Sequence, residues 1–180
     1  MTELMTGKAS WGPASTKIVE WYDPMISAAA VAQMTGLEFL QAIKAGDLPP
    51  APIAGILGVE IEELSEGRVV FTCTPDESVY NPIGVVHGGL VCTLADTVAA
   101  CAVQSTLGHG VGYTSIDLNI SYLRAVTKDS GQLRAVGTVT KPGRRVAFAK
   151  AEVFDGSGKP VADASTSCLV IPTPGSASAG

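Results

Sequence analysis

The chain has 180 residues, enough for one full-sized domain with an extension but too few for two ordinary domains. Hydrophobic residues make up 46% of it and charged residues 16%, so most of the chain is expected to fold around a sizeable core. A formal net charge of -5 argues against nucleic-acid binding through a basic face, and no stretch is long and apolar enough to predict a membrane span.

The cysteines predict neither disulfides nor a metal centre. None has the Cys-x-x-Cys spacing of zinc and redox sites, and all lie in apolar segments, as buried free thiols do. They are Cys73, Cys92, Cys101 and Cys168. Because the chain has only two histidines, we expect no metal and no cofactor. The cytoplasm is the simplest compartment for such a chain.

Residues 1–52 are predicted to form an N-terminal arm with short helices. Residues 1–22 contain Gly, Ser, Pro and both tryptophans without clear periodicity, which is typical of an extended arm. Further on, Leu37, Leu40 and Ile43 share one helical face and Gly46 provides a stop, so a helix is predicted over 36–46. The prolines at positions 49, 50 and 52 are expected to end helix formation and to lead into the main domain.

The main domain is predicted over residues 53–171. Alternating patterns predict two strands first, and a long uncharged stretch with one carboxylate predicts the helix that follows them. Four more strands come after it, separated by turn sequences rich in Gly, Pro and Asp. The strands are predicted at 56–63, 67–74, after the turn at 108–110, and at 131–141, 145–155 and 161–171, and the helix at 88–107.

The strand after residue 110 alternates between apolar and polar residues. Ile116, Leu118, Ile120 and Tyr122 are expected on one face, and Ser115, Asp117, Asn119 and Ser121 on the other. The order of elements indicates an α+β fold, because a uniformly apolar helix can be buried on all sides only if an antiparallel sheet curves around it. The tail at 172–180 is rich in Gly, Ser and Ala and is predicted to be disordered.

The predicted helix carries one charged residue, Asp96. An ionised carboxylate is costly to bury unless it is paired, hydrogen-bonded or used in chemistry. One interpretation is a buried Asp that bonds to a neighbouring hydroxyl or backbone group. The other is a carboxylate facing a cleft, acting as a nucleophile or as a general base on water.

A loop with His87, Gly88 and Gly89 leads into this helix, about two turns before Asp96. The N-terminus of a helix presents unpaired N–H groups and a partial positive charge, which suits an oxygen that becomes negative in a transition state. A tight turn with a capping His is the alternative for these three residues. The sequence shows no motif of a serine hydrolase elbow, a phosphate-binding loop or a zinc protease. Cys92 or Cys101 on the helix is a weak candidate for a thiol nucleophile, because the sequence assigns no His to activate it.

The loop and the helix together carry a resemblance to a known family. The residues concerned are Asn81, Gly84, His87, Gly88, Gly89 and, in the helix, Asp96. In this pattern the chain resembles the hotdog-fold acyl-CoA thioesterases, specifically their PaaI-like branch, over about residues 53–171. The resemblance implies a hotdog fold, a curved antiparallel sheet wrapped around one long central helix, here with an N-terminal helical extension.

The resemblance also implies the roles of the site residues. Asp96 resembles the acid that attacks the thioester or activates water, and Gly88 the backbone N–H donor to the carbonyl oxygen. Asn81 and His87 resemble polar groups that orient the carbonyl, the loop or the water, and Ser115 a hydroxyl that positions the water. In family dimers the loop of one subunit faces the helix Asp of the other, so a homodimer or homotetramer with a shared active site is expected.

A basic turn matches the anionic part of a coenzyme A substrate. Lys141, Arg144 and Arg145 lie in one turn of an otherwise acidic chain and are predicted to contact the phosphates, the arginines through bidentate contacts. A solvated hairpin turn is the alternative. Gly89, which lets the backbone approach a ligand closely, is assigned to the same substrate-binding set.

The predicted function is therefore an acyl-CoA thioesterase that hydrolyses an acyl- or aryl-CoA thioester to the free acid and coenzyme A. A non-catalytic acyl-CoA binding or sensing protein on the same fold is the alternative. A hydratase or dehydratase is less favoured, since such enzymes place an acid and a His differently and no His follows Asp96 in the helix. The sequence does not identify the acyl group.

Overall fold

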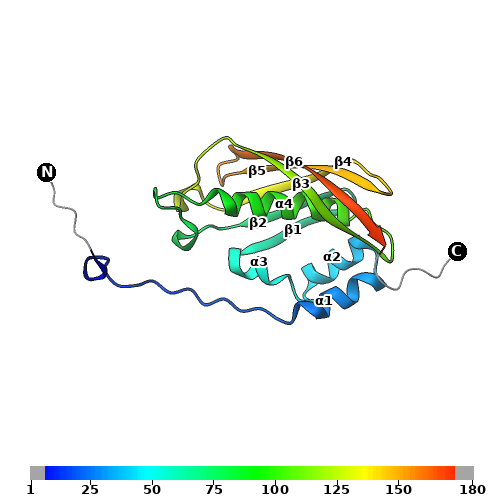
Figure 1. Cartoon of the computed structure of the whole chain (residues 1–180), viewed down its shortest axis with the longest axis horizontal. Helices are drawn as coiled ribbons and strands as arrows, with labels where there is room; N and C mark the ends of the chain where they lie inside the picture. The colour runs from blue at the N-terminus through cyan, green and yellow to red at the C-terminus, as the bar shows by residue number, and fades with distance from the viewer. Residues whose placement is uncertain (1–6, 173–180) are drawn as a thin grey trace.

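The computed structural model describes residues 7–172, which form a curved six-stranded sheet around one helix, with further helices along one side (Figure 1). All pairs of neighbouring strands are antiparallel, in the order β1-β2-β4-β5-β6-β3. The strands are β1 Val59–Ser65, β2 Arg68–Cys73, β3 Val111–Tyr122, β4 Leu133–Lys141, β5 Val146–Phe154 and β6 Pro160–Pro172. The predicted hotdog architecture is confirmed.

The central helix α4 spans Gly88–Gln104 and packs against β2, β3, β4, β5 and β6. Its apolar residues are buried on nearly every side, and Leu94, Val98 and Val103 expose no surface at all. Burying one such side chain stabilises a fold by roughly 1.5–3 kcal/mol. A helix without a polar face is therefore stable here because the sheet curves around it.

The sheet approaches α4 most closely at Gly137 of β4. A Cβ atom at this position would lie 2.1 Å from the carbonyl oxygen of Val98, a backbone atom that cannot turn aside as a side chain can. The absence of a side chain at residue 137 thus sets the distance between the sheet and the helix.

Replacing Gly137 with Ala is expected to lower the free energy of unfolding by about 3 kcal/mol or more, since the added methyl group forces the helix away from the sheet. Urea unfolding followed by circular dichroism measures this change. Gly108→Ala is the matched control, because a Cβ at residue 108 meets nothing within 4 Å and should change stability by less than about 0.5 kcal/mol. Equal midpoints for the two variants would contradict the close approach.

Within the described residues, the N-terminal segment contains five short helices, which are η1 Lys8–Ser10, α1 Pro24–Ala30, η2 Val31–Gln33, α2 Gly36–Ala45 and α3 Pro52–Leu57. The helix predicted over 36–46 is confirmed as α2. Thr35 and Glu38 form a capping box at its start, and Gly46 takes the left-handed conformation at its end.

The strand predicted from residue 56 is wrong in its first residues. Ile56 belongs to α3, which begins at Pro52, and β1 starts only at Val59. The first N–H groups of a helix have no acceptor within the helix, so a proline, which has no N–H, costs nothing there. Pro52 therefore starts a helix, whereas we expected it to end one.

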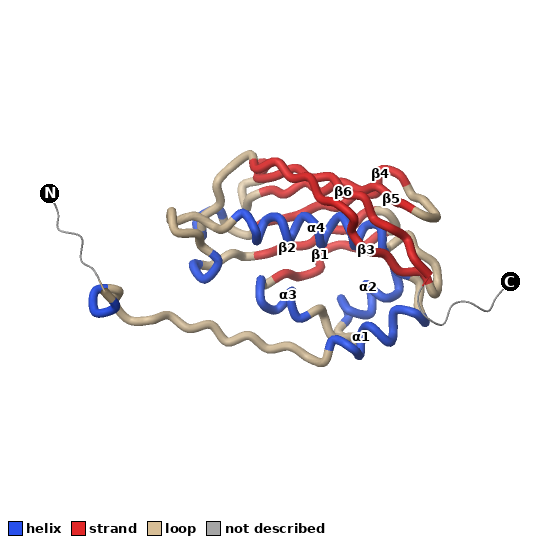
Figure 2. The backbone as a smooth tube through the Cα atoms, in the orientation of Figure 1, coloured by secondary structure: helices blue, strands red, loops and turns tan. Residues whose placement is uncertain are grey.

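The N-terminal helices dock against the side of α4 that the sheet leaves open between its edge strands β1 and β3 (Figure 2). The N–H of Gly36 donates to the carbonyl oxygen of Leu107 at 2.8 Å. A Cβ on Gly36 would lie 1.7 Å from the carbonyl oxygen of Gln104, so glycine is required where α2 meets the C-terminal end of α4.

The predicted alternation along β3 is wrong at Ser115. Ser115 pairs with Cys168 and Asp117 pairs with Ser167, so Ile116 is a bulge without a partner and its side chain is exposed. An extra residue in one strand reverses the faces beyond it. Ser115 therefore points to the inner face, as Leu118 does two positions past the bulge.

No helix within residues 7–172 is long and apolar enough to cross a membrane. Pro172 ends β6, and the rest of the tail predicted to be disordered lies outside the described residues.

Candidate active site

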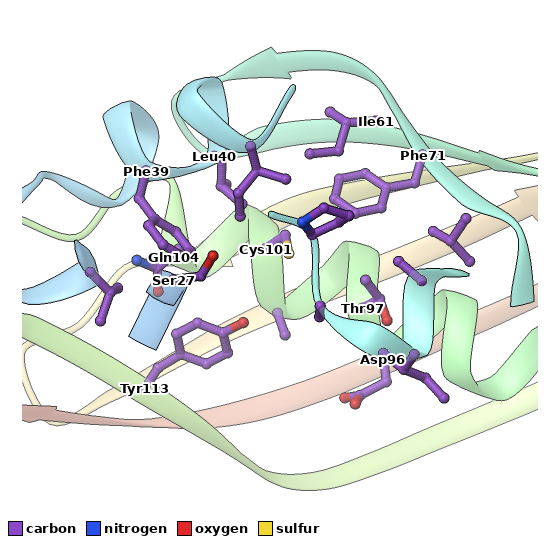
Figure 3. Close-up of a pocket in the computed structure, with 18 of the residues that line it drawn as sticks. Ser27, Phe39, Leu40, Ile61, Phe71, Asp96, Thr97, Cys101, Gln104 and Tyr113 are labelled. Carbon is purple, nitrogen blue, oxygen red and sulfur yellow. The ribbon is translucent and has the colours of Figure 1, made fainter. Parts of the chain in front are cut away.

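Asp96 projects from α4 into a cavity of about 990 Å³ between α4, the start of β3 and the N-terminal helices (Figure 3). Its carboxylate is half-buried, and Oδ1 accepts a hydrogen bond of 2.9 Å from Ser115 Oγ. The bulge at Ile116 is what brings Ser115 to this position. Because Ser115 occupies Oδ1, the other carboxylate oxygen remains for a ligand or a water.

Asn81 holds the loop before α4 in shape. Its side-chain oxygen accepts from the N–H groups of Ile83 at 3.1 Å and Val85 at 3.3 Å, and its own N–H donates to the Val85 carbonyl oxygen. Gly84 at the centre of this turn has a φ of 82°, in the left-handed region that favours glycine. Of the three orienting roles predicted for Asn81, these contacts support the role toward the loop.

His87 is the N-cap of α4. Its Nδ1 accepts the N–H of Gly89 at 2.8 Å, so this side chain caps the second amide of the helix. Its carbonyl oxygen accepts the N–H of Leu90. Of the first three amides of the helix, only that of Gly88 has no acceptor within residues 7–172, which makes it the available donor for an oxyanion.

Tyr122 covers the start of the helix, a contact that sequence reasoning missed. Its hydroxyl donates to the carbonyl oxygen of Gly88 at 3.0 Å, and its ring would lie 3.2–3.3 Å from a Cβ at residue 88. In the sequence Tyr122 was one residue of an apolar strand face, with nothing to distinguish it. Its contact depends on the end of β3 crossing the start of α4.

Gly88 and Asp96 are not brought together within one chain. Eight residues of helix separate them by about 12 Å along the axis. They also line different hollows, since Gly88 faces a smaller one beside Tyr122 and Val126. One thioester carbonyl is too small to contact both groups of the same chain, because a hydrogen bond spans only about 3 Å.

The basic turn lies at the other end of α4 from Gly88. It joins β4 to β5, where Arg144 and Arg145 are exposed. Close to it, Val139 N–H donates to the Gly67 carbonyl oxygen, and Gly67 N–H donates to the hydroxyl of Ser105, just past the helix end. The structure therefore does not bring the turn together with the 81–89 loop of the same chain.

The cysteine thiols near the site are poor nucleophiles. Burial raises the pKa of Cys101, which lines the cavity, to about 12, and raises that of Cys73 to about 11. Both thiols are protonated at neutral pH, and a protonated thiol is a weak nucleophile. Asp96 is thus the better candidate for the reactive group.

Comparison with known proteins identifies the family. The profile of the family described as "Thioesterase superfamily" matches residues 83–162. A Halobacterium salinarum protein named as an inferred esterase is 36% identical over 106 residues, which cover 56% of this chain and 68% of that protein. Human acyl-coenzyme A thioesterase 13 is 29% identical over 59% of this chain and 76% of its own length. The chain spans only 64% of the length of a relative from Haemophilus influenzae.

Solved structures share the same fold. The E. coli PaaI protein from the phenylacetic acid degradation operon superposes with a TM-score of 0.68 over 79% of this chain and 97% of that one, at 24% sequence identity. The predicted resemblance to hotdog thioesterases of the PaaI-like branch is confirmed. The fold, the family profile and the Halobacterium relative together show that the chain belongs to the thioesterase superfamily, a family of thioester hydrolases.

Proposed function

We propose that this protein is an acyl-CoA thioesterase, which hydrolyses an acyl-CoA to the free acid and coenzyme A. The observation that carries the proposal is the Asp96 carboxylate, hydrogen-bonded to Ser115 and facing a large, mostly apolar cavity. An apolar cavity with few polar groups is typical of a site for an acyl chain. The similarity to a named acyl-coenzyme A thioesterase supports the same substrate class.

In the proposed reaction the thioester carbonyl oxygen accepts the N–H of Gly88 at the start of α4. Oδ2 of Asp96 either takes a proton from water as the water oxygen attacks the carbonyl carbon, or attacks that carbon itself to give an anhydride that water then hydrolyses. In both routes the carbon–sulfur bond breaks and the coenzyme A thiolate takes up a proton. Ser115 orients the carboxylate through its hydrogen bond to Oδ1.

We further propose that the carbonyl is held between two chains, with Gly88 from one and Asp96 from the other. The 12 Å separation along α4, estimated from about 1.5 Å per residue, supports this arrangement, because one chain alone cannot place both groups on one carbonyl. β3 is a twelve-residue edge strand, and such an edge can pair with a second copy. The functional unit is then a homodimer, or a tetramer of two dimers.

Release of free thiol from a panel of aromatic and aliphatic acyl-CoAs tests the proposed activity. We expect turnover with at least one member of the panel, detected with a thiol reagent. Tight binding of acyl-CoA without thiol release would instead favour the non-catalytic sensor.

The basic turn provides a separate test of coenzyme A recognition. Replacing Arg144 and Arg145 with Ala is expected to raise KM for acyl-CoA by about tenfold with little change in kcat, because each bidentate arginine–phosphate contact contributes to binding of the anionic tail. Lys159→Ala, in the exposed β5–β6 turn, is the matched control and should leave KM unchanged. An unchanged KM in the double variant would remove the basic turn from the substrate site.

A further inference from the structure

The cavity beside Asp96 continues along α4 as far as the N-terminal helices. The residues of α4 that line it are three or four positions apart and so share one face of the helix. They are Thr93, Asp96, Thr97, Ala100, Cys101 and Gln104. Much of the opposite wall comes from α1, α2 and α3. This mostly apolar part suits the acyl group, since the charged coenzyme A tail is costly to remove from water.

The end of the cavity remote from Asp96 is polar. Gln104 is 5% exposed, and its carboxamide makes no hydrogen bond with any residue between 7 and 172. A buried amide without a partner is costly and is rarely kept in a native fold without a ligand or a water. Figure 3 shows Gln104 at the opposite end of the lining residues from Asp96, close to Phe39 and Ser27.

The groups around Gln104 can bond a neutral oxygen. Burial raises the pKa of Tyr113 well above its usual value, and the Tyr113 hydroxyl lies against the thiol of Cys101, about one helical turn before Gln104. Ser27 Oγ donates to the Pro49 carbonyl oxygen at 2.7 Å and keeps lone pairs to accept. Lys44, the one Lys or Arg among the lining residues that the structure describes, donates to the Glu62 carbonyl oxygen. A hydroxyl or carbonyl can pair with the Gln104 amide and with the Ser27 hydroxyl at this end.

The length of the cavity limits the ligand further. Asp96 and Gln104 are eight residues apart on α4, or about 12 Å along its axis. A medium-length acyl chain spans such a distance when its thioester lies at Asp96. A single aromatic ring does not.

We infer that this pocket takes a medium-length acyl group that carries a hydroxyl or other neutral hydrogen-bonding oxygen at the end remote from the thioester. Gln104 forms the subsite for that oxygen, and the N-terminal helices form the wall opposite it. The inference rests on the proposed thioesterase function. It also assigns a role to the N-terminal segment, which lies outside the part of the chain that the family profile matches.

The inference is tested by comparing ω-hydroxyoctanoyl-CoA with octanoyl-CoA. The wild-type protein should hydrolyse the hydroxylated compound with a kcat/KM at least about tenfold higher, because the plain chain leaves the Gln104 amide unpaired. Gln104→Met keeps the length of the side chain and removes its donors and acceptors, so it should abolish the preference while octanoyl-CoA is still hydrolysed. Gln132→Met, at an exposed position, is the matched control and should keep the preference. Equal values in the wild type, or a preference that survives Gln104→Met, would overturn the inference.

Binding measurements separate this inference from the proposed activity. In the Asp96→Asn background, calorimetry should show tighter binding of ω-hydroxyoctanoyl-CoA than of octanoyl-CoA, and adding Gln104→Met should remove the difference. If the wild type hydrolyses neither compound but the binding preference is present and depends on Gln104, the thioesterase proposal fails and the subsite stands. Equal binding of the two compounds would remove the subsite whatever the turnover.

Discussion

Replacing Asp96 with Asn is expected to lower kcat by at least about a hundredfold while the protein stays folded. The substitution keeps the size and shape of the side chain and its hydrogen bond from Ser115, but the amide has no negative charge with which to attack the carbonyl or take a proton from water. KM should change little, since the carboxylate acts on the reacting carbon rather than on the coenzyme A tail. Initial rates of thiol release over a range of acyl-CoA concentrations give both constants.

Asp163→Asn is the matched control for this loss. It removes the same charge from an exposed position on β6 and should leave kcat within about twofold, as surface substitutions usually do. Circular dichroism and the unfolding midpoint show whether both variants are folded. A folded Asp96→Asn protein with near-normal kcat would contradict the assigned role of the carboxylate.

Removing the backbone donor at residue 88 is expected to have an effect of similar size. Proline lacks the N–H group and is compatible with the first position of a helix, and the φ of -63° and ψ of 133° at His87 are allowed before proline. Gly88→Pro should therefore lower kcat by about a hundredfold to a thousandfold, the usual cost of one oxyanion donor. Steady-state kinetics with the best substrate of the acyl-CoA panel measure the loss.

Gly88→Ala separates the loss of the donor from the steric effect of the substitution. Both variants add a Cβ, which would lie 3.2–3.3 Å from the ring of Tyr122, but only the alanine keeps the N–H. The ratio of their kcat values thus reports the amide proton. If the two variants have equal kcat values, the Gly88 amide is not the oxyanion donor.

The order of the elements and the reactive carboxylate could be predicted because local sequence specifies them. Turn residues and alternating side chains separate the strands, and one charge in an apolar helix is conspicuous in any context. Asp96 could therefore be identified, and the resemblance alone predicted that Ser115 positions a water near it; the direct hydrogen bond between Ser115 and Asp96 was not predicted. The alternation along β3 by itself placed Ser115 on the wrong face, because a bulge depends on the pairing of β3 with β6 rather than on the residues of β3.

The rest of the site could not be read from the sequence because it depends on contacts between distant segments. In the sequence nothing distinguishes Gln104 from the other residues of the helix. It lies in the site because α2 packs over it at Gly36. Tyr113 was not singled out because its enclosure by the N-terminal helices has no local signal. Arg144 and Arg145 were assigned to the coenzyme A phosphates by their charge, and the sequence gives no sign that the sheet places their turn at the end of α4 remote from Gly88 of the same chain.

Mixing two inactive variants shows whether two chains complete one active site. Asp96→Asn and Gly88→Pro proteins, unfolded together and refolded, or coexpressed, would form mixed dimers with one intact Gly88–Asp96 pair. With random pairing in an equal mixture, we expect recovery of about a quarter of wild-type activity. Activity that stays at the level of the separate variants, although mixed dimers are present, would contradict a shared site.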